Sequence, residues 1–273
     1  MFDCKSKNKR IIAKVTELGL TLKPGTENCV KNFAIIHLEP SPIPLSKLEH
    51  TLRTGEPAFD HIYGMSFFEY LNQNRKLREI FDDTMDEYAK LANTSMLVSG
   101  YDYTVFNHIV DVGGGNGKFL IEILEQTPNA KGTVLEIQSV IEATKKAIEE
   151  SNLQDRCTTF VGSFFDVIPP NGDCYILRNC LHDWNDEKAL KILVNIRKQM
   201  KPGTKLLAME MKIPDGTEPH LYKEVDMHVL AHFAGRKRTK ADFESLFAQS
   251  SLKLIRFVEF KTGPMSIIEA EPV

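Results

Sequence analysis

The sequence has no apolar run long enough to cross a membrane as a helix. A bilayer-spanning helix needs about 18 or more consecutive apolar residues, and no stretch of the 273 residues approaches that length. The apolar segment after the charged amino terminus is broken by Lys14 and Glu17, which does not fit a secretory signal. We therefore expect a cytoplasmic protein with no membrane partner.

Cysteine is scarce and shows no pairing pattern. The five cysteines are odd in number and none forms a C-x-x-C pair; they are Cys4, Cys29, Cys157, Cys174 and Cys180. Disulfide frameworks and structural zinc sites both need cysteines at short, recurring spacings. We therefore expect free or buried thiols in a reducing compartment.

Excess charge of either sign is also lacking. The chain has 34 Lys and Arg against 37 Asp and Glu, a net charge of −3, so it has no global positive field to attract nucleic acid. Residues 235–238 form a short basic cluster, GRKR. We expect this cluster to be a solvated loop before a helix whose N-cap is Thr239, and we expect no nucleic-acid partner.

The hydrophobic pattern changes near residue 100. Residues 45–97 repeat apolar side chains at three- and four-residue spacing, which predicts two or three helices. Prolines at positions 40, 42 and 44 predict a stiff, non-helical connector before them, and residues 11–22 fit either a helix or a short hairpin. After residue 100, short β-rich runs alternate with helical stretches. We predict a mainly helical region over 1–100 and an α/β domain over 101–273.

The second region predicts a doubly wound sheet. Strands are expected at 107–114, 131–137, 157–162, 172–180, 203–211, 252–260 and 265–271, and helices at 117–128, 139–151, 186–200, 218–234 and 239–250. Alternating strands and helices predict a parallel sheet covered on both faces. The short link between the last two strands favours an antiparallel hairpin at the end of the sheet. A parallel sheet with such a terminal hairpin is the class I methyltransferase topology, which a plain dinucleotide-binding fold lacks.

A glycine-rich loop follows the first strand of this region. Gly113, Gly115 and Gly117 recur at alternate positions, so the third glycine comes one residue earlier than in the dinucleotide pattern G-x-G-x-x-G. Asp111 precedes the loop, which suits a ligand with an amino-acid cation better than one with a pyrophosphate. Glu136 ends the second strand, where a carboxylate can accept hydrogen bonds from two ribose hydroxyls. The alternative is a simple tight turn, which the two acids argue against.

A histidine follows the fourth strand in the segment LHDWNDE. His182 lies where ligand crevices open in parallel sheets, and it can act as a general base near neutral pH. The alternative is a histidine that caps the next helix or fills a gap in the core. Glu210 ends the neighbouring fifth strand, so its carboxylate is expected to hold one tautomer of the imidazole. We expect Asp183 to point elsewhere, at the start of the following helix.

Four segments carry a family resemblance: RTGEPAFDHIYGMSFFEYL, IVDVGGGNGKFL, LRNCLHDWNDEKALKIL and GRKRTKADFESLF. They resemble the small-molecule O-methyltransferases, which include plant phenolic O-methyltransferases, acetylserotonin O-methyltransferase and bacterial polyketide-tailoring enzymes. The resemblance extends over nearly the whole chain from Leu18. It implies a class I methyltransferase that uses S-adenosylmethionine to methylate a hydroxyl group of a small aromatic or polyketide-like molecule.

The resemblance also implies roles for single residues. His182 matches the base that removes the proton of the acceptor hydroxyl, and Glu210 matches the carboxylate that orients it. The expected cofactor site combines the residues of the glycine loop with positions that match cofactor contacts in the family. It comprises Asp111, Gly113, Gly115, Gly117, Glu136, Ser163, Phe164 and Arg178. Candidates for the acceptor pocket are Met96, Met227 and His228. His232 lies four residues after His228, a metal-ligand spacing, but no third ligand accompanies the pair, so we expect no metal site.

Three features depart from the family pattern. Ser163 stands where an aspartate usually contacts the adenine amino group, which predicts weaker cofactor binding. Lys237 stands where plant members have a second glutamate beside the base. Residues 1–100 match only part of an N-terminal dimerisation and acceptor-pocket region, so we expect a monomer or a weakened homodimer. The alternative function is a truncated, non-catalytic paralogue that binds only the cofactor or a partner.

Overall fold

The computed structural model describes residues 2–7, 10–26, 29–38, 42–91, 95–233, 235–261 and 263–273. The residues with a predicted place that lie outside the described residues include Pro40 of the proline connector, Ala234 at the end of a predicted helix, and Thr262 in the link between the last two strands. The chain divides into two compact units, residues 1–93 and 94–273. Among the described residues, no helix has the length and apolar character that a membrane span requires.

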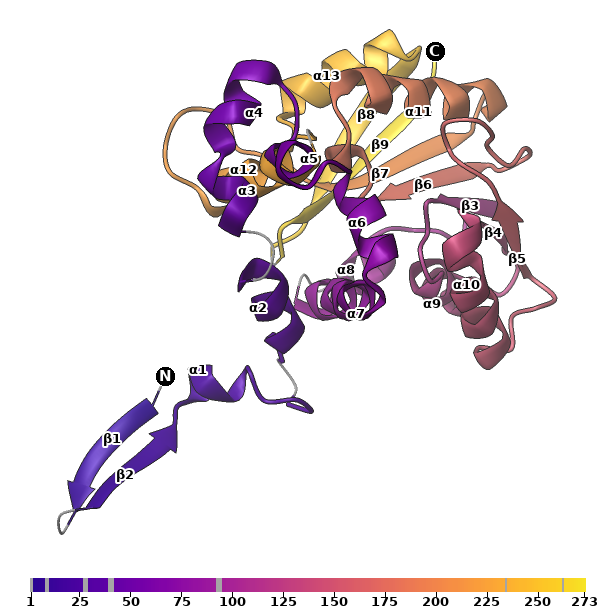
Figure 1. The fold of residues 1–273 in the computed structure, drawn as a ribbon. Helices are drawn as coiled ribbons and strands as arrows, with labels where there is room; N and C mark the ends of the chain where they lie inside the picture. Colours follow the sequence, from indigo (N-terminus) through magenta and orange to yellow (C-terminus); the bar gives the residue numbers. More distant parts are fainter. Residues whose placement is uncertain are drawn as a thin grey trace. The chain divides into compact units, whose positions relative to one another are not determined.

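The first unit begins with a two-stranded antiparallel hairpin (Figure 1). β1 (Phe2–Lys7) pairs along its whole length with β2 (Arg10–Val15). The four-residue helix α1 (Glu17–Leu20) follows directly. Residues 11–22, for which the sequence left a helix and a hairpin open, therefore contain the end of a hairpin and a short helix.

Six further helices lie among the described residues of the first unit: α2 (Lys31–Leu38), α3 (Pro42–Ser46), α4 (Leu48–Thr54), α5 (Ala58–Tyr63), α6 (Phe67–Gln73) and α7 (Arg75–Leu91). The prediction of two or three helices over residues 45–97 was wrong, because that range contains α4, α5, α6 and α7 and the helical pattern is interrupted between them. Gly55 and Gly64 end α4 and α5 in the left-handed conformation, with φ of 77° and 69°. Ser66 then starts α6 with a capping box.

The prediction of a non-helical proline connector was also wrong. Pro42 and Pro44 both lie inside α3, and Pro44 is buried. The first N–H groups of a helix have no partner within the helix. A five-residue helix therefore loses no internal hydrogen bond to prolines in its first turn.

The second unit is built on a seven-stranded sheet with the order β5-β4-β3-β6-β7-β9-β8. Its strands are β3 (His108–Val112), β4 (Lys131–Glu136), β5 (Cys157–Val161), β6 (Cys174–Arg178), β7 (Lys205–Met211), β8 (Leu252–Glu259) and β9 (Met265–Pro272). The first five strands pair in parallel, and β9 pairs antiparallel with both β7 and β8. The predicted doubly wound sheet with an antiparallel terminal hairpin is confirmed.

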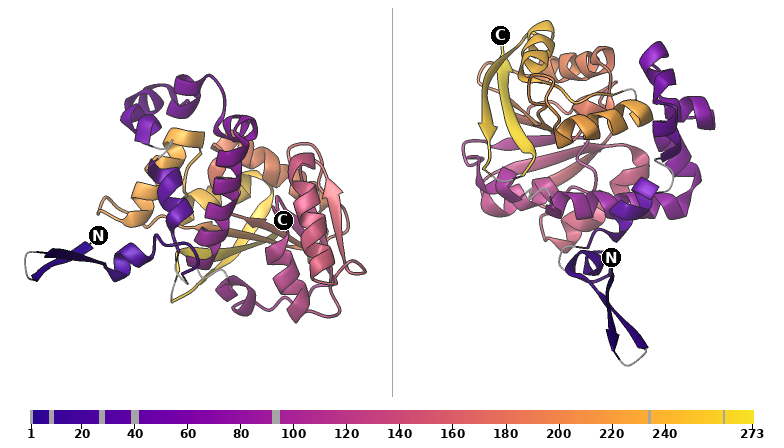
Figure 2. Two further views of the ribbon diagram at one scale, coloured as in Figure 1. Left: turned by 60° about the horizontal axis from the view of Figure 1, so that its bottom comes forward. Right: turned by 90° about the vertical axis from the view of Figure 1, so that its left-hand side faces the viewer.

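Helices cover both faces of this sheet (Figures 1 and 2). The described helices of this unit are α8 (Ser95–Ser99), α9 (Lys118–Gln126), α10 (Gln138–Glu150), α11 (Asp186–Gln199), α12 (Leu221–Phe233) and α13 (Lys240–Gln249), together with a 3-10 turn, η1 (Leu181–Asp183). Thr239 caps α13, as predicted, and forms a capping box with Asp242. Asn185 caps α11, because its side chain accepts the backbone N–H of Lys188.

The centre of the sheet is almost fully buried. β3, β6 and β7 supply a core of side chains with little or no exposure, among them Val110, Val112, Tyr175, Leu177, Leu206 and Ala208. Parallel strands covered on both faces read as continuous apolar runs, and each fully buried aliphatic side chain contributes about 1.5–3 kcal/mol. This core fixes the carboxyl ends of the strands, where the candidate site lies.

Candidate functional site

Three glycines form the turn between β3 and α9. Gly113, Gly115 and Gly117 have φ of 72°, 59° and 76°, in the left-handed region that glycine adopts without strain. A Cβ on Gly114 would lie only 2.6 Å from Oδ2 of Asp111. The loop therefore needs glycine both for its conformation and for its close approach to the strand.

Asp111 lies beside this loop with a buried carboxylate. The residue is 1% exposed, and among the described residues neither carboxylate oxygen has a hydrogen-bond partner. Burial raises the pKa of Asp111 to about 6; the nearby Arg178 opposes this rise and Glu136 adds to it. Buried polar groups in folded proteins almost always have partners. An unpartnered carboxylate is therefore suited to a ligand that brings a cationic amino group.

This arrangement gives a direct prediction for Asp111→Asn. An ionised Asp111 costs stability in the ligand-free protein, because its folded pKa of about 6 lies above the ordinary value of 3.8. The cost is complete above pH 6 and is lost as the pH falls to about 4. Asp111→Asn should therefore melt at a higher temperature than the wild type at pH 7, with a smaller difference at pH 4. A variant that is less stable at pH 7 would contradict the prediction.

Glu136 ends β4 beside the same loop. Its Oε2 accepts the N–H of Gly115 at 3.0 Å, and its Oε1 accepts the N–H of Ile137 at 2.8 Å. Each carboxylate oxygen can accept a second hydrogen bond. Glu136 is thus held in place by the backbone and keeps acceptor capacity for ligand hydroxyls.

Of the remaining predicted cofactor residues, Ser163 and Phe164 follow β5, and Arg178 is the last residue of β6. A Cβ on Gly113 would lie 3.3 Å from the ring of Phe164, so this ring borders the loop. The Ser163 hydroxyl accepts the N–H of Phe165 at 3.2 Å, and the Arg178 guanidinium lies 4.8 Å from the centre of an aromatic ring on α9. Because the carboxyl ends of parallel strands meet at one edge, all predicted cofactor residues share this edge of the sheet.

His182 and Glu210 form a hydrogen-bonded pair at the same edge. Nδ1 of His182 lies 2.7 Å from Oε2 of Glu210. Oε1 of Glu210 accepts the backbone N–H groups of Cys180 at 3.1 Å and of His182 at 3.3 Å. A carboxylate at Nδ1 favours the tautomer that leaves Nε2 able to accept a proton. The structure brings together the two residues that the sequence pairs, while their catalytic role stays a prediction.

Glu210 remains ionised although it is only 1% exposed. Burial alone would raise its pKa, but the charges and hydrogen bond of His182, with Lys237 and Arg238, outweigh burial and hold the pKa at about 2. The carboxylate is therefore a permanent hydrogen-bond acceptor at neutral pH.

Asp183 does not point away from the histidine, so that prediction was wrong. Its Oδ1 lies 3.3 Å from Nε2 of His182. The strand end is followed first by the tight turn η1, in which the N–H of Asp183 donates to the carbonyl of Cys180 at 3.2 Å. The helix begins only after this turn, with Asn185 as its cap. Burial raises the pKa of Asp183, and the charges of His182 and Lys237 oppose that rise.

The basic cluster 235–238 is largely buried, so the expectation of a solvated loop was wrong. Lys237 is 6% exposed and Arg238 is 1% exposed. A Cβ on Gly235 would lie 2.0 Å from the carbonyl oxygen of His182. The cluster therefore packs directly against the backbone of the turn that carries the histidine.

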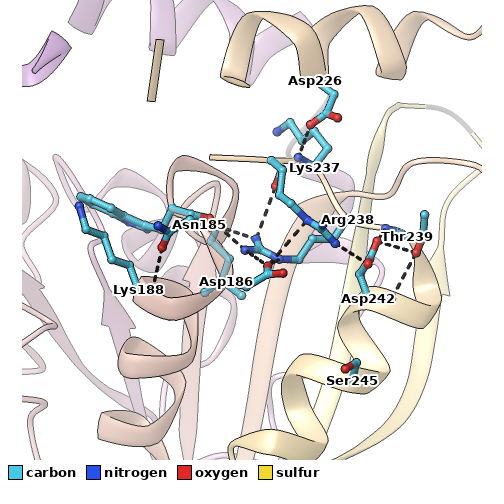
Figure 3. Close-up of polar contacts among 12 residues, drawn as sticks. Asn185, Asp186, Lys188, Asp226, Lys237, Arg238, Thr239, Asp242 and Ser245 are labelled. Atoms are coloured by element: carbon cyan, nitrogen blue, oxygen red, sulfur yellow. Dashed lines mark hydrogen bonds and ion pairs between the residues drawn. The ribbon is translucent and has the colours of Figure 1, made fainter. Parts of the chain in front are cut away.

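Arg238 binds this turn and the start of α11 through four hydrogen bonds (Figure 3). Its guanidinium donates to the carbonyls of Leu181 at 2.7 Å and Trp184 at 2.9 Å, and twice to the carboxylate of Asp186, at 2.8 and 3.1 Å. The two carbonyls lie on either side of His182 in the sequence. This role of Arg238 was not predicted; the only signal in the sequence is its position immediately before a helix cap.

The predicted pocket residues are divided between two helices. Met227, which is 48% exposed, and His228 lie on α12, which contacts η1. Met96 lies on α8, which contacts α9 and β9. Nδ1 of His232 lies 2.8 Å from the carbonyl of His228. Within the described part of the chain, no group of three His, Cys, Asp or Glu side chains is arranged to hold a metal ion.

A cavity of about 740 Å³ opens at the opposite edge of the sheet, near the amino ends of β6 and β7. Its lining includes Tyr101, Lys205, Arg256 and Glu269. Glu269 pairs with the other three, at 2.8 to 3.1 Å. These groups satisfy one another and lie far from the His182 turn, so the cavity does not form part of the candidate site.

The O-methyltransferase domain family matches residues 45–252. The chain is 35% identical over 259 residues to the phenazine O-methyltransferase PhzM of Lysobacter antibioticus, covering 95% of this chain and 75% of that protein. It is 32% identical over 223 residues to the mitomycin biosynthesis 6-O-methyltransferase of Streptomyces lavendulae, covering 82% of this chain and 63% of that protein. The chain thus spans less than two thirds of the second relative.

The solved structures agree with this relationship. The chain matches the crystal structure of an O-methyltransferase from neocarzinostatin biosynthesis, in complex with S-adenosylmethionine and 2-hydroxy-5-methyl naphthoic acid, with a TM-score of 0.87 and 28% identity. The match covers 99% of this chain and 81% of that one. The family match, the sequence identities and the shared fold agree: the chain belongs to the O-methyltransferase family.

Proposed function

We propose that the protein transfers a methyl group from S-adenosylmethionine to a hydroxyl group of a small aromatic molecule, with His182 as the general base. The observation that carries this proposal is the 2.7 Å pair of His182 and Glu210 at the sheet edge that also holds the glycine loop. An aromatic acceptor is supported by the phenazine O-methyltransferase among the relatives and by the naphthoic acid bound in the neocarzinostatin structure.

The residues around the glycine loop fit this cofactor. The unpartnered carboxylate of Asp111 suits its amino-acid cation, and Glu136 can accept hydrogen bonds from its ribose hydroxyls. Phe164 and Arg178 border the expected place of the adenine. When bound, S-adenosylmethionine supplies a methyl group that is already activated on a sulfonium.

The chain itself has two tasks in this reaction, alignment and proton removal. When the two reactants are held aligned at near-attack distance, little further translational and rotational entropy is lost in reaching the transition state. Glu210 accepts the Nδ1 hydrogen of His182, so Nε2 takes the hydroxyl proton while the acceptor oxygen gains the methyl group. Glu210 and Asp183, at 2.7 and 3.3 Å, stabilise the imidazolium that forms. A positioned base contributes about 10²–10⁴-fold.

S-adenosylhomocysteine is expected to raise the melting temperature of the protein. A ligand at 100 times its Kd stabilises the folded state by about 2.7 kcal/mol. Glu136→Ala should remove most of this rise, because the ribose hydroxyls lose their acceptor. Differential scanning fluorimetry checks both results, with the exposed Glu142→Ala on α10 as the control. Stabilisation by NADH but not by S-adenosylhomocysteine would refute the cofactor assignment.

Detection of a methylated product distinguishes an enzyme from a non-catalytic binding protein. Mass spectrometry over a panel of phenols should detect a product heavier than its acceptor by one methylene unit. Binding of S-adenosylhomocysteine without any such product would favour the non-catalytic alternative.

A further inference from the structure

Lys237 is a buried cation directly behind the proposed base. Its side chain is 4% exposed, and its Nζ lies 4.0 Å from Oε2 of Glu210, the oxygen that also binds His182. Its backbone N–H donates to the carboxylate of Asp226 on α12, as Figure 3 shows. Lysine is almost never fully buried without a partner. The position of Lys237 therefore depends on the acidic groups around it.

Three carboxylates share this cation. Burial lowers the pKa of Lys237, and the charge of Arg238 lowers it further. The carboxylates of Glu210, Asp183 and Asp226 raise it. Lys237 in turn opposes the rise that burial causes in the pKa of Asp183 and of Asp226. Arg238, the neighbouring buried cation, is already bound to the Asp186 carboxylate and two carbonyls. Among the described residues, the charged or titratable groups around Lys237 are Glu210 on β7, His182 and Asp183 on η1, Asp226 on α12, and Arg238.

The charge of this cluster acts on the acceptor. The reacting oxygen must approach Nε2 of His182, where Oδ1 of Asp183 already lies at 3.3 Å. An oxygen that becomes negative there meets the field of Asp183, Glu210 and Asp226. A buried ammonium beside these groups weakens that field, because charges interact strongly where water is excluded. A hydroxyl that keeps its proton carries no negative charge, so it gains little from the ammonium.

We propose that Lys237 is a positioning residue that sets acceptor specificity, an inference that rests on the proposed function. Through Glu210 and Asp183, the charge of Lys237 adapts the site to acidic phenols, which react as ionised oxygens. The same charge disfavours weakly acidic hydroxyls. The proton of such a phenol passes to Nε2 of His182 or to water before or during transfer. The oxygen then forms its bond to the methyl group, and the methyl–sulfur bond breaks. Lys237 itself neither gains nor loses a proton.

The test uses 4-nitrophenol, whose ionised form is coloured, bound to the protein in the presence of S-adenosylhomocysteine. Absorbance gives the pH at which the bound phenol ionises. In Lys237→Met this pH should rise by about one unit or more, a tenfold change in the ionisation equilibrium. Lys237→Arg should stay close to the wild type because it keeps the charge. Lys240→Met removes a lysine that is 57% exposed and should change nothing.

A kinetic measurement accompanies the titration. With S-adenosylmethionine, the ratio of kcat/KM for 4-nitrophenol to that for 4-methoxyphenol should fall at least about tenfold in Lys237→Met. Unchanged melting temperature and S-adenosylhomocysteine binding show that the variant is folded; if Met fails this check, Lys237→Gln replaces it. An unchanged ratio and an unchanged ionisation pH in a folded variant would overturn the role of Lys237. No methylated product from any phenol with the wild type would instead refute the proposed function.

Discussion

His182→Ala is expected to lower turnover at least about 100-fold, within the range for loss of a positioned general base. The imidazole is the group that Glu210 orients at 2.7 Å, and its Nε2 would face the acceptor. The cofactor residues lie on the glycine loop and on other strand ends, so the affinity for S-adenosylhomocysteine should change little. Steady-state kinetics with a phenol and calorimetric titration of S-adenosylhomocysteine measure the two quantities.

The acidity of the acceptor provides the internal control for this variant. A strongly acidic phenol ionises without help, so His182→Ala should impair its methylation less than that of a weakly acidic alcohol. Glu210→Gln should cost less than His182→Ala, because it disturbs orientation without removing the base. His220→Ala, which removes an exposed histidine directly before α12, should keep near wild-type turnover. Near-full methylation of both acceptors by His182→Ala would show that another group removes the proton.

The second unit of the fold is readily predicted because its signals are local. Its strands are covered on both faces and read as short apolar runs between polar helices. The glycine loop marks the first turn, and the short link before β9 marks the terminal hairpin. His182 and Glu210 could be paired for the same reason: His182 follows β6 and Glu210 lies at the end of the adjacent parallel strand β7, so both must lie at one edge of the sheet.

The features that the sequence did not predict all depend on tertiary partners. A charged run such as 235–238 usually faces water, and nothing local indicates that Arg238 meets two carbonyls from residues 181–184. The direction of Asp183 depends on the turn η1, which no periodicity reveals. The breaks between α4, α5 and α6 depend on Gly55 and Gly64, whose role as helix ends appears only with their left-handed backbone conformation.

Arg238→Met is expected to lower the free energy of unfolding by about 2–6 kcal/mol, because two backbone carbonyls would lose their buried donor. The guanidinium is 1% exposed and donates to Leu181, Trp184 and Asp186. Methionine fills part of the space but donates nothing, and a buried carbonyl left without a partner costs about 1–3 kcal/mol. Trp184 is the single tryptophan of the chain, so its fluorescence during urea unfolding reports on this turn.

The neighbouring Arg236 supplies a matched control. Its side chain is 40% exposed and forms ion pairs with Asp242 and Asp186; exposed ion pairs contribute about 0–1 kcal/mol. Arg236→Met should therefore destabilise the protein far less than Arg238→Met. Because Arg238 holds the carbonyls on both sides of His182, its loss should also lower kcat under conditions in which the variant remains folded. Equal destabilisation by the two variants would mean that the hydrogen bonds to the turn contribute no more than a surface ion pair.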